Sequence, residues 1–182
     1  MKAHVCHHIK DLAPRMHNLV RLAELAELQL DEKQIDVLAE MNAFNIEGSV
    51  SRNAHSGAHG RGSTKLHAQS ERGVHMVDES VAGAIRRYLQ ELNQRGVRAD
   101  FAVVFGSQVT GRSHALSDID LLVVSPEFDE TRSREDINLL WRVAARTDSR
   151  IEPIAVGLRQ YEVDDSSAIV EIARREGQKV YP

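Results

Sequence analysis

Three short apolar runs separated by helical patterns constrain the fold of this chain most strongly. The runs cover residues 101–105, 119–124 and 151–156, and each has the length and composition of a buried strand. From Met76 onward they alternate with helices, which is typical of a small sheet covered by helices in the α+β or α/β class. Pro153 lacks the backbone N–H that a central strand would use, so the third run is predicted to lie at a sheet edge.

Capping residues and apolar stripes locate the helices of this part. Asp78 is placed to cap a helix over residues 79–93, and Gly96 is placed to end it. Further helices are predicted over 133–145 and from 166 or 167 to about 177. We expect the first two helices to bury Val81, Ile85, Tyr88, Leu89, Leu92, Ile137, Leu140 and Trp141.

Residues 1–50 have a helical pattern and no strand pattern. In residues 16–29 the apolar side chains recur near one helical face. Asp31 is then placed as an N-cap with Gln34 three residues on, which is the arrangement of a capping box. The helix that follows is predicted to end at about Phe44, with Ile35, Leu38 and Met41 facing inward. This part is therefore predicted to be a short N-terminal helical hairpin.

Between the hairpin and the α/β part lies a stretch of different composition. Residues 51–75 are rich in Gly, Ser, His and Arg and have almost no large apolar residues. Such a segment buries too little surface to offset the entropy of ordering it, which predicts a flexible linker. We therefore divide the chain into a helical segment at 1–50, a linker at 51–75 and an α/β domain at 76–182.

Charge and composition exclude several function classes. The net charge of −4 argues against binding of long nucleic acid, which favours a basic surface. Aromatic residues make up 4% of the chain, too few for a platform that stacks single-stranded bases. The single cysteine, Cys6, allows no disulfide within the chain, and no apolar run approaches the roughly 20 residues of a membrane span. We expect a cytoplasmic protein with no membrane partner.

Two short motifs next to the predicted strands suggest chemistry. Gly106 follows the first strand directly, where a glycine lets the backbone approach a ligand, and Ser107 adds a hydroxyl donor. After ten intervening residues, Asp118 and Asp120 stand at i and i+2 at the start of the second strand, so their side chains share a face. Two adjacent carboxylates repel each other unless a cation lies between them, and Mg²⁺ takes oxygen ligands together with substrate phosphates. The pattern predicts a metal site that faces a phosphate-binding turn.

A third carboxylate is available on the last strand. Glu152 would reach the same site if its strand lies next to the strand of Asp120. Three carboxylates and a nucleotide could hold two metal ions, one at the attacking oxygen and one at the leaving group.

Together these elements resemble the minimal nucleotidyltransferases of the DNA polymerase beta superfamily. The family motif is a Gly-Ser pair, about ten residues, an Asp-x-Asp, and a later acidic residue on a strand. The resemblance covers residues 76 to about 180 and implies a small mixed sheet flanked by helices. It also implies ATP as substrate and Mg²⁺ bound by Asp118, Asp120 and Glu152. Basic residues often follow the Gly-Ser pair in this family. Here the segment reads GSQVTGR, which leaves Arg112 as the phosphate contact beside Gly106 and Ser107.

The N-terminal hairpin resembles the later helices of a HEPN domain, in the stretch HNLVRLAELAELQLDEKQIDVLAEMNAFNIEG. HEPN proteins are often encoded beside a minimal nucleotidyltransferase as a toxin–antitoxin pair. The resemblance implies transfer of AMP from ATP to a hydroxyl of a partner HEPN toxin, with the chain acting as antitoxin. Two alternatives remain at this point: a non-catalytic binding module that neutralises the partner by contact, and a nucleotidyltransferase that acts on a small molecule.

Overall fold

A computed structural model of the chain describes residues 17–53, 76–114 and 116–182. Its sheet has four strands in the order β3-β2-β1-β4, with β1 at Phe101–Val104, β2 at Ile119–Ser125, β3 at Ile151–Gly157 and β4 at Gln178–Val180. The pair β2–β3 is parallel, and β1 pairs antiparallel with both β2 and β4. The predicted class, a small mixed sheet flanked by helices, is confirmed.

The third predicted strand is indeed an edge strand. β3 hydrogen-bonds to β2 alone, and Pro153 lies opposite Leu121 in that ladder. A proline has no N–H to donate. At the edge of the sheet, the missing donor leaves no carbonyl of a neighbouring strand unpaired. The fourth strand, β4, was not predicted, since its three residues carry no apolar run.

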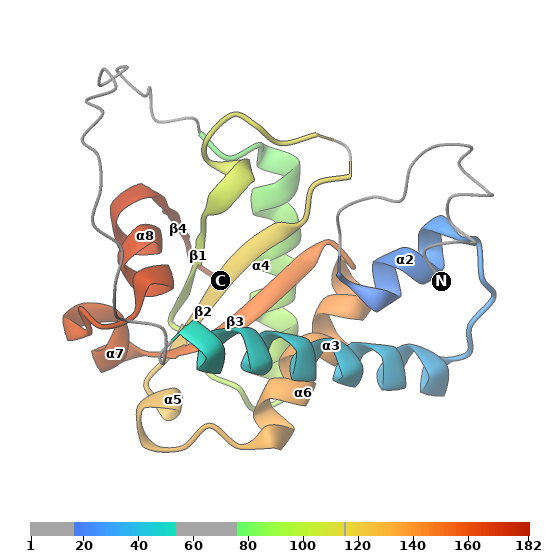
Figure 1. Cartoon of the computed structure of the whole chain (residues 1–182), viewed down its shortest axis with the longest axis horizontal. Helices are drawn as coiled ribbons and strands as arrows, with labels where there is room; N and C mark the ends of the chain where they lie inside the picture. Colours follow the sequence, from blue (N-terminus) through green and yellow to red (C-terminus); the bar gives the residue numbers. More distant parts are fainter. Residues whose placement is uncertain (1–16, 54–75, 115) are drawn as a thin grey trace.

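Helices cover both faces of the sheet (Figure 1). On one face lie α4 at Glu79–Gln94 and α6 at Arg134–Thr147, and the predicted stripe of α4 and Leu140 of α6 pack in the core with the sheet. Trp141, also expected to face inward, is buried on the opposite side of α6, against the hairpin. On the other face lie α7 at Leu158–Val163 and α8 at Ala168–Glu176, which bury Tyr161 and Val170 against β1 and β2. A further short helix, α5 at Glu127–Glu130, connects β2 to α6.

Capping interactions are present at the predicted helix boundaries. The Asp78 carboxylate accepts a hydrogen bond from the Ser80 N–H, and Gly96 follows α4 with a φ of +97°. Ser133 forms a capping box with Asp136, and Ser167 caps α8. The short helices α5 and α7 were missed because neither is long enough to show a helical period.

The N-terminal hairpin consists of α2 at Leu19–Leu25 and α3 at Glu32–Asn53. The capping box at its turn is confirmed: the Gln34 N–H donates to the Asp31 carboxylate, and the Asp31 N–H donates to the Gln34 side chain. Two expectations were wrong. The helix continues past Phe44, and Met41 is 50% exposed, because the buried positions of α3 are Ala39, Asn42 and Ala43 on the adjacent face.

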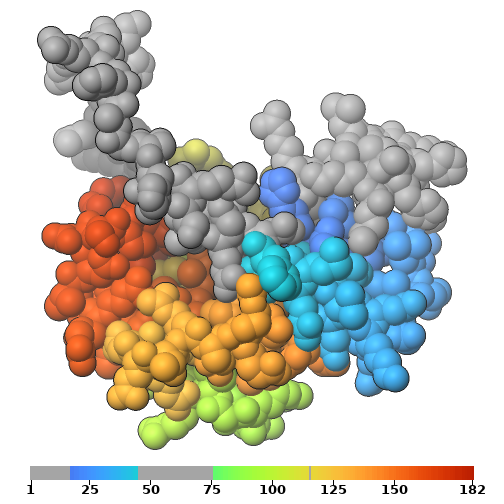
Figure 2. All heavy atoms as spheres, turned by 60° about the horizontal axis from the view of Figure 1, so that its bottom comes forward, coloured from blue at the N-terminus to red at the C-terminus, as the bar shows by residue number. Residues whose placement is uncertain are grey.

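The hairpin packs on the outer side of α6. Trp141 is 3% exposed and lies in a cluster with Val20, Ala39 and Ala43. Ion pairs at the rim join Arg142 to Glu40 and Arg146 to Asp36, at 2.8 and 2.7 Å. Figure 2 shows the atoms of α3 directly against those of α6. The sheet is thus covered on this side by two successive layers of helices, α6 and then α3.

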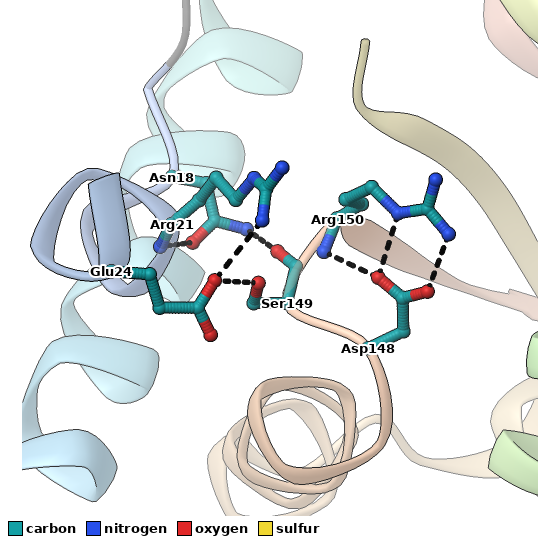
Figure 3. Close-up of polar contacts among 6 residues, drawn as sticks. All are labelled: Asn18, Arg21, Glu24, Asp148, Ser149 and Arg150. Atoms are coloured by element: carbon teal, nitrogen blue, oxygen red, sulfur yellow. Dashed lines mark hydrogen bonds and ion pairs between the residues drawn. The ribbon is translucent and has the colours of Figure 1, made fainter. Parts of the chain in front are cut away.

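A buried group of polar side chains fixes the hairpin to the turn before β3. We call Asn18, Asn42 and Ser149 the amide cluster. Asn18 Nδ2 donates to the Ser149 carbonyl at 2.8 Å, and Asn42 Nδ2 donates to Asn18 Oδ1 at 3.0 Å. Asn42 Oδ1 in turn accepts from the Leu19 N–H at 2.9 Å. Figure 3 shows Asn18 reaching from α2 to this turn.

Parts of the predicted division lie outside the described residues. These are residues 1–16, most of the predicted linker (54–75) and residue 115. The first three linker positions, 51–53, belong to α3. Within the described ranges, no helix combines the length and apolar character needed to cross a membrane.

Candidate active site

The chain makes a tight turn where β1 ends. Residues Gly106–Gln108 form a single 3-10 turn, η1, and Gly106 has a φ of +71°, in the left-handed region that favours glycine. The Phe105 N–H donates to the Asp120 carbonyl at 3.1 Å, which holds the turn beside the start of β2. The predicted glycine turn therefore lies directly beside the predicted acidic motif.

Gly106 and Asp120 are in close approach. A Cβ atom on Gly106 would overlap the Asp120 carboxylate and lie 3.3 Å from its Cγ. A glycine is required here for two reasons, its backbone conformation and the space taken by the carboxylate.

Asp118, Asp120 and Glu152 lie together, and we call them the acidic site. Asp120 is the second residue of β2, and Asp118 precedes the strand by one residue, so both side chains extend to the same face. In the parallel ladder, Asp120 is the register partner of Glu152 on β3. The condition set by the sequence, that the strand of Glu152 neighbour that of Asp120, is met (β2 and β3 in Figure 1).

Burial and mutual repulsion disfavour ionisation at the acidic site. Burial, together with the charges of Asp118 and Asp120, raises the pKa of Glu152 to about 8. Burial and the charge of Asp118 raise the pKa of Asp120 to about 6. Burial also raises the pKa of Asp118, and the positive charges of Arg21, His17 and His114 oppose that rise. The fold thus holds three carboxyl groups where their charges are poorly compensated.

A family model described as "Nucleotidyltransferase domain" matches residues 85–179, just over half of the 182 residues. The chain belongs to this nucleotidyltransferase family. Its general activity is therefore nucleotidyl transfer. The match begins inside α4, so α2 and α3 lie outside it, and the HEPN-like character of the hairpin stays a prediction. No curated protein matches the chain.

The acidic site of this nucleotidyltransferase fits a hard divalent cation. Asp118 Oδ1 is buried and has no hydrogen-bond partner among the described residues. As the described part of the chain stands, no three His, Cys, Asp or Glu side chains form a ready-made metal centre. Such sites take some of their ligands from substrate phosphates, and carboxylate oxygens are the donors that Mg²⁺ prefers. A cation bound here would compensate the negative charges of the three carboxylates.

The other predicted nucleotide contacts differ in how close they lie to the acidic site. Ser107 is part of η1 and half-buried, immediately after Gly106. Arg112 has an exposed side chain, and its backbone N–H donates to the Ser107 carbonyl at 3.3 Å. The turn thus connects Arg112 to Ser107 through the backbone, while the role of its side chain remains a prediction.

Two residues near the nucleotidyltransferase site were not predicted from the sequence. Gln108 stands where a basic residue is common in the family, and its Nε2 donates to the Asp118 carbonyl at 3.1 Å. It therefore ties the glycine turn to the backbone of the acidic motif. Arg21 comes from α2, and its charge acts on Asp118. No sequence signal could identify Arg21, because only the docking of the hairpin brings it to this end of the sheet.

Proposed function

We propose that the chain uses Mg²⁺ to transfer AMP from ATP to a hydroxyl group of a partner protein with a HEPN fold, and acts in the cytoplasm as its antitoxin. The observation that carries the catalytic part is the register of Asp120 with Glu152, beside Asp118 and the Gly106 turn. This arrangement gathers three carboxylates next to a backbone that a phosphate can approach closely.

Each residue of the site has a separate role in this proposal. Gly106 and Ser107 bind phosphate oxygens of ATP, with the Ser107 hydroxyl as a donor, and Arg112 is a further phosphate contact. Asp118, Asp120 and Glu152 would hold Mg²⁺, which would supply positive charge at the phosphates and would lower the pKa of the attacking hydroxyl.

The reaction exchanges one phosphorus–oxygen bond for another. The acceptor oxygen loses its proton to solvent and forms a bond to the α-phosphorus. The bond from that phosphorus to the bridging oxygen of the β-phosphate breaks, and pyrophosphate leaves with the electron pair. The residues of this chain contribute by holding ATP in line with the acceptor, and such positioning supplies most of the rate in reactions of this kind.

A protein acceptor is supported by two features of the hairpin. One is its resemblance to HEPN helices. The other is its outer surface, where Val37 and Met41 are 57% and 50% exposed one turn apart on α3. Exposed apolar residues that are close together on one helix favour contact with another protein.

Transfer of label from α-labelled ATP tests the proposal. The full chain is incubated with Mg²⁺ and the product of the neighbouring gene, the proposed HEPN partner, and label on that protein is measured. We expect label with the wild type and almost none with Asp118→Asn. Asp100→Asn is the matched control, because Asp100 is exposed and directly precedes β1, at the end away from Gly106.

Three outcomes would contradict the proposal. Undiminished transfer by Asp118→Asn would remove the acidic site from the mechanism. Inhibition of the partner without ATP and Mg²⁺ would indicate a binding module. Label on a small molecule in place of the partner would indicate a different acceptor class.

A further inference from the structure

Helix α2 contacts both chain segments that lead into the acidic site. Leu22 and Ala26 pack with Leu116, which lies two residues before Asp118. At the start of the helix, Asn18 Nδ2 donates to the carbonyl of Ser149, three residues before Glu152. The hairpin is therefore anchored to the two approaches of the site.

Arg21 lies on α2 between these two contacts. Its Nη1 pairs with Glu24 Oε2 at 3.2 Å, and the same carboxylate oxygen accepts a hydrogen bond from the Ser149 hydroxyl. The side chain of Arg21 is only 20% exposed. Figure 3 shows Arg21 and Glu24 together on the side of α2 that faces the Ser149 turn. The guanidinium is thus held in place by Glu24 and by packing.

The guanidinium has an unused donor and lies on the helix that contacts both approaches of the acidic site. Arg21 Nε is buried and has no hydrogen-bond partner within residues 17–53, 76–114 and 116–182. A positive charge with a free donor is therefore held on the helix that packs against the segments leading to Asp118 and Glu152.

We propose that Arg21 is a substrate-binding residue, and that its guanidinium contacts phosphate oxygens of the nucleoside triphosphate at the acidic site. This inference rests on the proposed function. A guanidinium presents a planar set of N–H donors that matches a phosphate group, and it stays charged at any working pH. Arg112 is the one basic residue in the turn GSQVTGR, where Gln108 and Thr110 stand in place of basic residues, so a second cation from the hairpin would complete the phosphate contacts. The N-terminal hairpin then supplies part of the nucleotide site.

This role is tested by the dissociation constant of an ATP analogue. The analogue has a methylene group between its α- and β-phosphates and therefore cannot donate AMP. The dissociation constant is measured with Mg²⁺ for the full-length wild type and for Arg21→Ala, Arg21→Lys and Arg98→Ala. We expect Arg21→Ala to weaken binding by about 10- to 100-fold, the effect of losing hydrogen bonds to a charged group. Arg21→Lys should recover only part of this, because an ammonium lacks the fork of donors. Arg98 is exposed next to β1, at the end away from Gly106, so its variant should bind as the wild type does.

A second measurement separates phosphate binding from an effect on the carboxylates. The affinity for Mg²⁺ alone should be unchanged or higher in Arg21→Ala, because a positive charge near the site is removed. Equal weakening of Mg²⁺ binding and of analogue binding would mean that Arg21 positions the carboxylates. That result would overturn the inference. If Arg21→Ala melts well below the wild type, the test uses Arg21→Lys and Glu24→Gln instead. Arg21→Lys should weaken binding of the analogue, and Glu24→Gln should not abolish that binding. The reverse result would overturn the inference.

Failure of this inference is distinct from failure of the proposed function. If the wild type binds the analogue and transfers label, and Arg21→Ala binds the analogue equally well, the inference is wrong and the proposed function stands. If the wild type neither binds the analogue nor transfers label, the proposed function is wrong and the role of Arg21 is wrong with it.

Discussion

The amide cluster and the acidic site are two polar groups near the starts of β2 and β3, and they differ in how well their atoms are compensated. In the amide cluster, the side-chain amides of Asn18 and Asn42 bond to each other and to backbone groups. In the acidic site, Asp118 Oδ1 is buried without a partner among the described residues, and burial together with neighbouring charges raises the pKa of Asp120 and Glu152.

This difference separates polar residues that stabilise the fold from polar residues that destabilise it and whose cost the rest of the fold offsets. A buried amide with its hydrogen bonds formed contributes to stability, and removal of one partner costs free energy. Buried like charges cost free energy in the absence of a ligand, so the remaining structure must supply it. Substitutions in the two clusters should therefore have opposite effects on stability.

The largest expected effect is the loss of activity in Asp120→Asn. We expect nucleotidyl transfer to fall by about 10³-fold, as when a group that stabilises transition-state charge is lost. The melting temperature should stay the same or rise, because a neutral amide removes the repulsion with Asp118. Transfer assays and thermal unfolding of the same preparation measure both. A melting temperature several degrees lower would show that Asp120 stabilises the fold, and would remove the contrast between the clusters.

A smaller loss of activity is expected for Gly106→Ala. The new Cβ would meet the Asp120 carboxylate, and alanine is strained at a φ of +71°. Displacement of Asp120 should lower transfer by roughly 10- to 100-fold, since small misplacements of reacting groups cost about that much.

Gly83→Ala is the matched control for the glycine variant. Gly83 lies inside α4, and a Cβ there would meet only Arg87 Nη1, at 3.7 Å. This variant should keep full activity and gain up to about 1 kcal/mol of stability from its helix propensity. Equal activity of the two alanine variants would contradict the close approach of Gly106 to the acidic site.

In the amide cluster the expected effect is on stability. Asn42→Ala removes the acceptor of the Leu19 N–H and a donor to Asn18. We expect a loss of about 1–3 kcal/mol in the free energy of unfolding, measured by urea denaturation. Gln90→Ala, at an exposed position of α4, should change it by less than about 0.5 kcal/mol. Equal effects of the two substitutions would mean that the cluster does not anchor the hairpin.

Much of this molecule could be predicted from local pattern. The strands that carry the site have apolar runs, and the helix starts have capping residues at Asp31, Asp78 and Ser133. The spacing of Gly106, Asp118 and Asp120 indicated a site because a turn after one strand and a pair on the next define a local geometry. These features depend on residues close together in the sequence.

Other features depend on contacts between distant segments. β4 has only three residues, and its place is decided by pairing with β1. Met41 was expected inside because it fits an apolar period, but the docked face of α3 is the one with Ala39 and Ala43. The small residues of this face pack against α6, and Asn42 bonds to Asn18 next to the Ser149 turn. A local apolar period does not indicate these contacts.

The smallest expected effect is a pH dependence of stability caused by the acidic site. The unfolded chain releases the proton of Glu152 near 4.5, the ordinary value, while the folded chain keeps it up to a pKa of about 8. Stability from this group is therefore complete below the ordinary pKa and is lost as pH rises through about 8. Asp120 adds the same trend at lower pH, through its pKa of about 6. Asp148, whose pKa is lowered, contributes only in more acidic solution.

Without metal, we expect the melting temperature to fall by a few degrees between about pH 6 and pH 9. Glu152→Gln should flatten this decline, because the variant has no proton to lose at that position. Mg²⁺ should flatten it in the wild type, since a bound cation favours the ionised carboxylates. Glu171→Gln, at an exposed position of α8, should decline as the wild type does. If the melting temperature of Glu152→Gln declined with pH as steeply as that of the wild type, ionisation of Glu152 would not destabilise the fold. The contrast with the amide cluster would then rest on hydrogen bonding alone.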